Sequence, residues 1–225
     1  MIYFSYPDNF KNNMKYRSEN LKEGIKLEEQ ILEPDKFKIS YPVVDNTKNK
    51  ENISNINNAI INEVGELFKS QALVDGVVDF NQILGDYEVT LNESGILSIL
   101  FSMYIYVNRA AHGYTKYSSI TVNIENGRVY SFSDLFNSKV NYTAVLNELA
   151  KQYIEQNNIT LINEYNGITP DQEYYLTPTS LVIYYQVYDY TPYVHGLFKI
   201  EIPYEKIKNI ISPVGPIAQI LNNEY

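Results

Sequence analysis

The chain has 225 residues, no cysteine and a formal net charge of −9 at pH 7. The absence of cysteine excludes disulfides, thiolate metal sites and cysteine nucleophiles, and the acidic charge argues against a nucleic-acid partner, because clustered Lys and Arg drive such binding. Tyrosine occurs 22 times and tryptophan is absent. This composition is typical of an AT-rich genome, and it also fits a recognition surface lined by tyrosine rings.

Residues 1–22 are polar and without periodicity, which predicts a loosely held leader. They lack the apolar core of a signal peptide, and no stretch of the chain approaches the ~20 apolar residues of a membrane span. We therefore expect no membrane span and a cytoplasmic protein, with an extracytoplasmic location as the alternative if the sequence is a piece of a longer, anchored protein. Residues 23–225 are expected to form one compact domain in two halves, at about 23–125 and 126–212.

Two strands and a long helix are predicted at the start of this domain. Apolar and polar residues alternate over 25–31 and 37–43, as in half-buried strands, and the Pro-Asp pair at 34–35 marks the turn between them. A helix follows, because apolar residues recur at three- and four-residue spacing. Its stripe consists of Ile53, Ile56, Ile60, Val64 and Leu67. Gly76 is expected to end or bend this helix, and the piece around Phe80 is less regular.

Three strands come next and are expected to form a meander. A short strand spans Tyr87 to Leu91, and the strongest strand of the chain covers 97–107, where apolar residues line one face without a break. This pattern predicts a central strand with one face wholly in the core. The partner strand covers 120–124, and the Asn-Gly pair at 126–127 favours a hairpin turn.

The remaining elements complete the predicted fold. SFSDLF at 131–136 gives a short turn, and a helix covers about 141–157. Residues 174–207 are interpreted as one hairpin that runs into a helix beginning at Pro203, since proline suits the first helical position. A short helix around Ile220 closes the chain. The order β-β-α-β-β-β-α-β-β-α predicts an α+β fold, with antiparallel sheets packed against two main helices and a short C-terminal helix.

Tyrosines on the predicted strands are the best candidates for a binding surface. They are Tyr104 and Tyr106 on the central strand, and Tyr184, Tyr188, Tyr190 and Tyr193 on and after a strand of the C-terminal hairpin. Of the second group, all but Tyr193 share one strand face at two- or four-residue spacing. An open face would present an aromatic platform for a protein or a glycan, whereas a face covered by helices would make these tyrosines core residues.

The two histidines, His112 and His195, are each followed by glycine in a loop between strands. They could form a metal or acid–base site with Asp189 or Asp75, because imidazole is a common metal ligand and a proton carrier near neutral pH. The alternative is that each His-Gly pair serves turn geometry and each ring bonds the local backbone. The sequence has no HExxH, no third histidine, no GxSxG and no glycine-rich phosphate loop, so we predict no catalytic residue, metal or cofactor.

A series of motifs covers about residues 25 to 212. The series consists of Tyr41-Pro42, RAAHGY at 109–114, the Asn126-Gly127 turn, FSDLF at 132–136, YYLTPTSLVIYY at 174–185, YTPY at 190–193 with Gly196, and Ile202-Pro203-Tyr204. In these motifs the chain resembles the extracytoplasmic domain of RsiV-type anti-sigma factors, and its N-terminal half resembles the accessory domain of PdaC-type peptidoglycan deacetylases. The resemblance implies a protein of Gram-positive bacteria that is exported or membrane-anchored, and the anti-sigma member binds lysozyme directly.

The sequence shows neither a transmembrane helix nor a deacetylase catalytic domain, so we expect neither transmembrane signalling nor deacetylation. The motif order and the lack of a catalytic signature together predict a non-enzymatic binding module that recognises a lysozyme-like protein or a cell-wall glycan. Two alternatives stay open. One is a hydrolase that depends on a metal or on the two histidines, and the other is a structural protein without a ligand.

Overall fold

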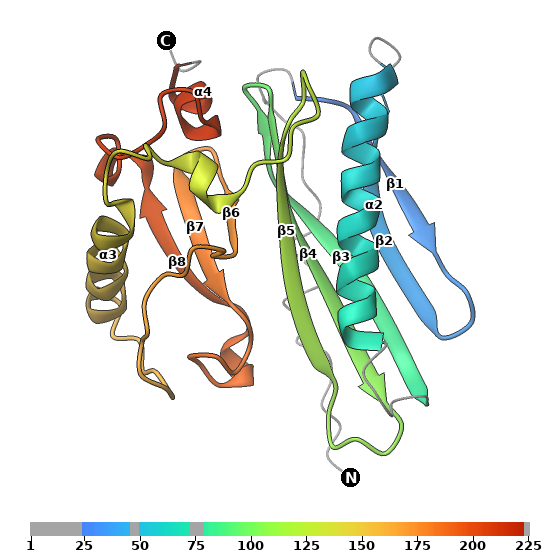
Figure 1. Cartoon of the computed structure of the whole chain (residues 1–225). Coiled ribbons are helices and arrows are strands. Elements are labelled where there is room, and N and C mark those ends of the chain that lie inside the picture. Colours follow the sequence, from blue (N-terminus) through green and yellow to red (C-terminus); the bar gives the residue numbers. More distant parts are fainter. Residues whose placement is uncertain (1–23, 46–49, 73–78, 223–225) are drawn as a thin grey trace.

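Two sheets lie beside each other in the computed structural model, one on each side of Figure 1. The structure describes residues 24–45, 50–72 and 79–222. The expected leader at 1–22, together with Asp75 and Gly76, lies outside these residues. No helix in the described part of the chain is long and apolar enough to cross a membrane. The predicted α+β class is confirmed, because sheets and helices form separate layers rather than alternating along the chain.

The larger sheet has five strands in the order β1-β2-β3-β4-β5. They are β1 (Leu27–Leu32), β2 (Phe37–Val44), β3 (Phe80–Glu93), β4 (Ile96–Val107) and β5 (Tyr114–Asn123). All neighbours pair antiparallel except β2 and β3, which pair in parallel, so the predicted purely antiparallel sheet is wrong at this point. The helix α2 (Lys50–Ala72) connects these two strands, and a helical crossover of this kind makes adjacent strands parallel.

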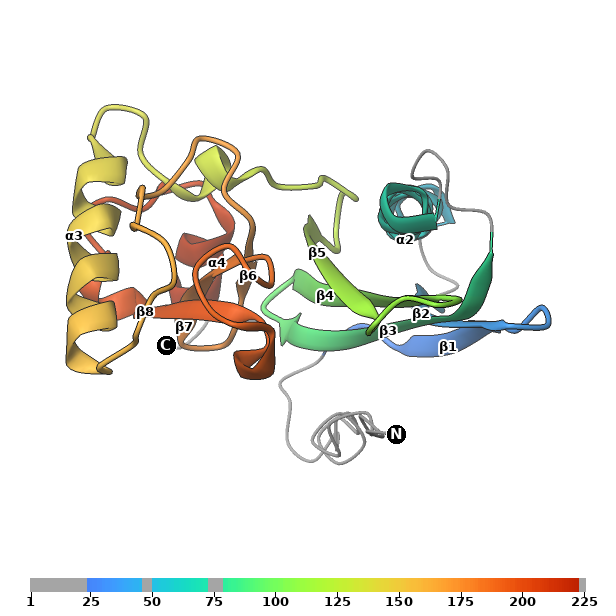
Figure 2. The ribbon, with the colours of Figure 1, turned by 90° about the horizontal axis from the view of Figure 1, so that it is seen from below.

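Helix α2 covers one face of the five-stranded sheet, as Figures 1 and 2 show. The predicted apolar stripe is confirmed, because its residues pack against the strands. Ile56, Ile60, Val64 and Leu67 are buried, and Ile53 is partly buried. The three- and four-residue spacing therefore identified both the helix and the face that it buries.

Strands β3 and β4 differ from their predictions. β3 begins at Phe80 rather than Tyr87, because register shifts at 80/82 and 89/91 interrupt the alternation by which a strand is recognised. β4 is buried on both faces over residues 96–103, not on one face only. One face lies under α2, and the other faces the smaller sheet, which the pattern of a single strand cannot reveal.

The smaller sheet is antiparallel and has the order β6-β7-β8. Its strands are β6 (Tyr174–Leu176), β7 (Ser180–Tyr185) and β8 (Phe198–Pro203). The prediction of one two-stranded hairpin missed β6, which has only three residues. Helix α3 (Tyr142–Gln156) lies along one side of this sheet, and η1 (Phe132–Leu135) and α4 (Pro216–Asn222) lie at its upper end in Figure 1. The predicted helix at 141–157 is confirmed, with Asn141 as its N-cap.

The helix predicted to begin at Pro203 is not an α-helix. It is a single 3-10 turn, η3 (Tyr204–Lys206), followed by further turns. Tyr204, Ile207 and Ile210 are all buried. The backbone bonds from Ile207 N to Tyr204 O and from Ile210 N to Ile207 O each join residues three positions apart. A buried residue at every third position matches the 3-10 period rather than the α-helical one.

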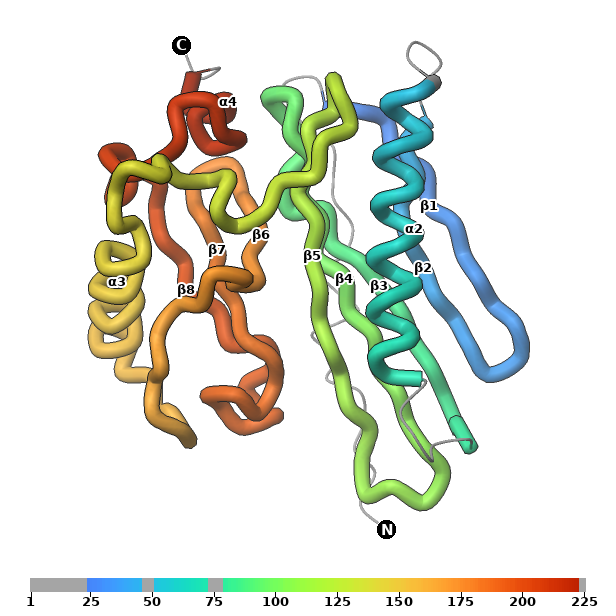
Figure 3. Tube along the Cα trace, in the orientation of Figure 1, coloured from blue at the N-terminus to red at the C-terminus, as the bar shows by residue number. Residues whose placement is uncertain are grey.

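Side-chain hydrogen bonds join the two sheets along a seam between β4, β5 and β6, which lie side by side in Figures 2 and 3. Ser98 Oγ accepts a hydrogen bond from Leu176 N at 3.1 Å. Tyr184 Oη donates to Ser119 Oγ at 3.0 Å, and Ser119 Oγ donates to Tyr174 O. The small hydroxyl side chains of the larger sheet therefore satisfy polar groups of the smaller one.

Candidate functional site

The predicted row of tyrosines does not exist as a strand face. β7 ends at Tyr185, and the chain then makes a tight turn. Tyr188 lies in this turn with a φ of 71°, a left-handed conformation outside the β region. Tyr184, Tyr188 and Tyr190 therefore do not share one face, because the chain leaves the sheet before the second of them.

Two of the predicted binding residues are core residues of different clusters. Tyr184 is fully buried in the seam, covered by the five-stranded sheet rather than by helices. Burial raises the pKa of Tyr184 well above its usual value, so its hydroxyl stays a hydrogen-bond donor. Tyr190 packs edge-on against Tyr185, with ring centroids 4.8 Å apart, in the core of the smaller sheet. Neither ring faces the surface.

Four rings with exposed or half-exposed surface form a continuous row, which we name the aromatic strip. Its members, in order, are Tyr114, Tyr188, Tyr193 and His112. The centroids of the first pair lie 6.5 Å apart with planes 12° from parallel. The second pair is separated by 5.7 Å at 28°, and the third by 6.0 Å at 32°. These values lie within the range of direct aromatic contacts.

The strip is exposed, and an apolar side chain adjoins it. Tyr188 is 42% exposed and Tyr114 37% exposed, while Val194, next to Tyr193 in the chain, is 87% exposed. Scattered apolar residues are normal on a protein surface, but a contiguous group marks an interaction site. The rings of the strip contact one another and form such a group, and Val194 follows one of them in the chain.

The connection between β4 and β5 carries one member of the strip, His112, and leads directly into a second, Tyr114, the first residue of β5. Its fold requires Gly113, because a Cβ there would lie 2.2 Å from Cζ of Tyr104. His112 Nδ1 lies 2.8 Å from Gly113 O, so this ring bonds the local backbone, as the turn interpretation predicted. Tyr106 Oη donates to Ala110 O at 3.3 Å. The half-buried Tyr104 and Tyr106 therefore support this loop, and the hydroxyl of Tyr104 also lies close enough to that of Tyr193 to interact with it.

The connection between β7 and β8 supplies the other two members and is tied to β5. Asp189 Oδ2 accepts from Gln186 N at 3.0 Å, which closes the turn that carries Tyr188. The side-chain amide of Gln186 binds the backbone of Tyr117 on β5. Tyr193 Oη lies 3.1 Å from Thr115 Oγ1, also on β5. The strip thus spans both sheets and depends on their contact.

The second histidine has other neighbours. His195 ends η2 (Tyr193–His195), is exposed and lines a pocket of about 320 Å³. The other lining residues are Asn157, Asn158, Ile159, Thr160 and Thr191. Within the described ranges, no group of three or more His, Cys, Asp or Glu could hold a metal ion. His112 contacts Tyr193, so the two imidazoles have different surroundings.

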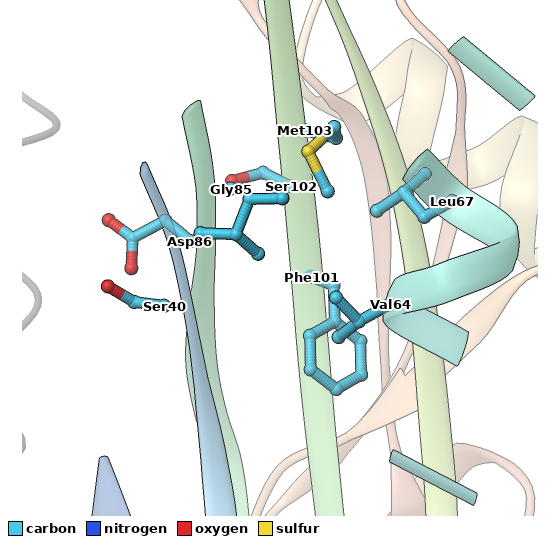
Figure 4. A pocket seen from close by; sticks show the side chains of 9 residues that line it. Ser40, Val64, Leu67, Gly85, Asp86, Phe101, Ser102 and Met103 are labelled. Carbon is cyan, nitrogen blue, oxygen red and sulfur yellow. The ribbon is translucent and has the colours of Figure 1, made fainter. Parts of the chain in front are cut away.

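A depression beside Gly85 of β3 is not a ligand cavity, because it has no space for a water molecule. Figure 4 shows Val64 and Leu67 of α2 on one side of the sheet and Asp86 and Ser40 on the other. The depression arises where glycine lacks a side chain, and neighbouring side chains fill it. It therefore belongs to the packing of the sheet.

Negative charge lies close to the strip. Burial and then the carboxylate of Asp189 raise the pKa of the Tyr114 hydroxyl. Burial also raises the pKa of Glu173, which Gln186 Nε2 and the charge of Lys116 lower in part and Asp189 raises further. The carboxylates of Glu173 and Asp189 are therefore close enough to repel each other.

Sequence reasoning missed Tyr114 and Val194. Tyr114 stands at the end of the RAAHGY motif, and its exposure follows from its place as the first residue of the edge strand β5. Val194 lies between two predicted residues in a turn bounded by Pro192 and Gly196. An apolar residue in a turn of this kind is expected to be exposed, and this expectation could have identified Val194 from the sequence.

The arrangement of two sheets with separate helices is a fold also found in solved structures. A DUF3298 family protein from Pseudomonas aeruginosa PAO1 superposes with a TM-score of 0.65 at 15% identity, over 85% of this chain and 96% of that chain. A member of the same family from Bacteroides fragilis NCTC 9343 superposes with a TM-score of 0.63 at 15% identity, over 89% of this chain and 100% of that chain. At this identity the likeness shows a shared fold.

Residues 133–205 match the family model described as "Protein of unknown function (DUF3298)". The matched range includes the β7–β8 connection that supplies Tyr188 and Tyr193. No curated protein matches the chain.

Proposed function

We propose that the protein is a non-enzymatic binding module that recognises a protein ligand through the aromatic strip and Val194. The observation that carries this proposal is the exposure of Tyr114 and Tyr188, whose rings stack on each other, together with that of Val194, which follows Tyr193 of the same strip in the chain. Tyrosine is enriched at protein interfaces, because its ring contributes apolar contact area while its hydroxyl stays hydrated or bonded.

The backbone of both loops supports a binding role. Tyr188 and Arg109 have φ values of 71° and 69°, although neither is glycine. Such left-handed residues cost about 1–3 kcal/mol each and concentrate at functional sites, where the surrounding structure holds them. Tyr188 belongs to the strip, and Arg109 lies in the loop that carries His112.

The nature of the ligand is proposed from charge and resemblance. A formal net charge of −9 favours encounter with a cationic protein, and the resemblance to RsiV-type extracytoplasmic domains favours a lysozyme-like ligand. This proposal entails an extracytoplasmic location, the alternative to the cytoplasmic expectation. A cell-wall glycan is the second candidate, because rows of aromatic rings also suit sugars, and the resemblance to the PdaC-type accessory domain favours it.

A calorimetric titration of the purified chain with hen egg-white lysozyme and with soluble peptidoglycan fragments tests the proposal. The key variant is Val194→Ser, with Val214→Ser as its matched control. Val194 is 87% exposed and Val214 is 86% exposed, but Val214 lies in the loop before α4, away from the strip. We expect lysozyme to bind the wild type, and Val194→Ser to weaken binding about tenfold, the loss of one buried apolar contact.

The control variant should bind as the wild type does. Heat with peptidoglycan fragments alone would support the glycan candidate instead of the protein one. The proposal fails if neither ligand binds, or if the two valine variants bind equally well.

A further inference from the structure

Asp189 places a negative charge beside the first two rings of the strip. It follows Tyr188 in the chain, and its carboxylate acts on the Tyr114 hydroxyl, whose ring lies 6.5 Å from that of Tyr188. Asp189 is exposed. In the described part of the chain it takes part in no ion pair. Two near-parallel rings and an unpaired carboxylate therefore share one patch of surface.

The turn fixes the position of this carboxylate. Oδ2 accepts from Gln186 N at 3.0 Å, and Asp189 N donates to Gln186 O at 3.1 Å. Among the described residues, none donates a hydrogen bond to Oδ1. The side chain of Gln186 is in turn hydrogen-bonded to the backbone of β5. The carboxylate of Asp189 is therefore oriented before any ligand arrives, which lowers the entropy cost of binding.

The charges that face this patch leave it negative. Glu173 lies next to Gln186, with Oε2 accepting from Nε2 at 2.7 Å, and it interacts with Asp189 and with Lys116. Lys116 is the cation that acts on Glu173. Glu63 also acts on Glu173, so this group holds one lysine and three carboxylates, and negative charge is in excess there.

We propose that Tyr114, Tyr188 and Asp189 form a docking point for an arginine or lysine side chain of the protein ligand. This inference rests on the proposed function and names the chemistry of its partner. A cation is attracted to the faces of tyrosine rings, and a carboxylate adds a charge-assisted hydrogen bond. Arginine fits better than lysine, because its planar guanidinium stacks on rings and pairs with carboxylates at the same time.

Three capped peptides serve as probes: hexa-arginine, hexa-lysine and hexa-citrulline, the last being the neutral analogue of the first. They are titrated into the wild type and two variants. Asp189→Asn removes the charge but keeps an oxygen for Gln186 N. Glu155→Gln removes the same charge from an exposed residue of α3, which lies on the far side of the smaller sheet from β5 (Figure 1).

Hexa-arginine should bind the wild type more tightly than hexa-lysine, and hexa-citrulline should not bind. Asp189→Asn should weaken hexa-arginine binding about tenfold, the size expected for a close charge pair with a ring contact. Glu155→Gln should change it by less than about twofold, because exposed charges far from the ligand are screened.

Equal loss in the two carboxylate variants, or equal binding of hexa-citrulline, would overturn the inference. Lysozyme binding that is weakened by Val194→Ser but unchanged by Asp189→Asn would also overturn it, while the proposed function would stand. A wild-type chain that binds neither lysozyme nor any peptide would overturn both.

Discussion

The side-chain amide of Gln186 hydrogen-bonds both backbone groups of Tyr117. Oε1 accepts from Tyr117 N at 2.9 Å, and Nε2 donates to Tyr117 O at 2.8 Å. Tyr117 lies on β5, the edge strand of the larger sheet, so Gln186 takes the place that a neighbouring strand would occupy and blocks edge-to-edge pairing. The same residue begins the turn that carries Tyr188. Gln186 therefore both protects the edge of β5 and fixes the position of the turn that carries part of the strip.

Gln186→Leu should destabilise the fold by about 1–3 kcal/mol, because two backbone groups of the buried Tyr117 lose their partner. The free energy of unfolding is measured in urea. Gln152→Leu on α3 is the control, since its side chain donates only to Glu148 one turn away at the surface, and it should change stability by less than about 0.5 kcal/mol. Equal effects of the two variants would show that the Gln186 amide is not a structural link.

Gly85→Ala should destabilise the larger sheet by about 1–3 kcal/mol through overpacking. The new Cβ would lie 2.7 Å from Cγ2 of Ile39 and 3.1 Å from Cε of Met103, and Ile39 is the parallel partner of Gly85 in β2. Gly65→Ala in α2 meets nothing within 4 Å and should stabilise by about 0.5–1 kcal/mol, because alanine is the better helix former. Thermal unfolding of both variants is the measurement, and a stabilised Gly85→Ala would contradict the packing at β2.

The fold was predictable where its signals are local. The stripe of α2 and the helix at 141–157 are read within a few residues, and both are confirmed. The parallel pairing of β2 and β3 was not, because strand order depends on where a 23-residue helix returns the chain, and not on alternation within either strand. The second buried face of β4 was missed for a related reason, since its cover comes from β6 and β7, about 80 residues later in the chain.

Glu173→Gln should increase stability at neutral pH. Burial raises the pKa of Glu173 above its usual 4.5. A carboxyl group whose pKa is raised on folding stabilises the fold when it is protonated, below its unfolded pKa, and that contribution is lost as the pH rises through the folded pKa. The wild type therefore loses stability with rising pH, whereas glutamine does not titrate and can still accept from Gln186 Nε2.

Urea unfolding of both proteins over a series of pH values measures this difference. The gap should be largest at neutral pH and should close below pH 4.5. Glu155→Gln, on the exposed side of α3, controls for the change in net charge. A wild type that is more stable than Glu173→Gln at neutral pH would show that the hydrogen bond and Lys116 outweigh burial.

The candidate site was predictable only in its residue types. Tyr188, Tyr193 and His112 were all candidates, but alternation from 182 to 190 placed the first of them on a strand that ends at Tyr185. Directly after that strand, the side chain of Gln186 bonds Tyr117, which is 69 residues away in sequence. No local pattern carries that information, so the strip emerges only when both sheets are in place.

Tyr188→Asn should separate the binding role of the strip from its part in folding. Asparagine tolerates the left-handed conformation that Tyr188 adopts at φ 71°, so relief of backbone strain offsets the loss of ring contacts with Tyr114 and Tyr193. The free energy of unfolding should change by less than about 1 kcal/mol. Binding of the protein ligand should be lost, because the ring at the centre of the strip is gone.

Tyr190→Asn is the matched control, two residues further along the same connection. Its ring is buried against Tyr185 and Phe198, so removing it should cost about 3 kcal/mol or more. Unfolding in urea and calorimetric titration are measured on both variants. If Tyr188→Asn were as unstable as Tyr190→Asn, the exposed Tyr188 would be a structural residue like the buried Tyr190. That result would contradict the proposal that the strip is a binding surface.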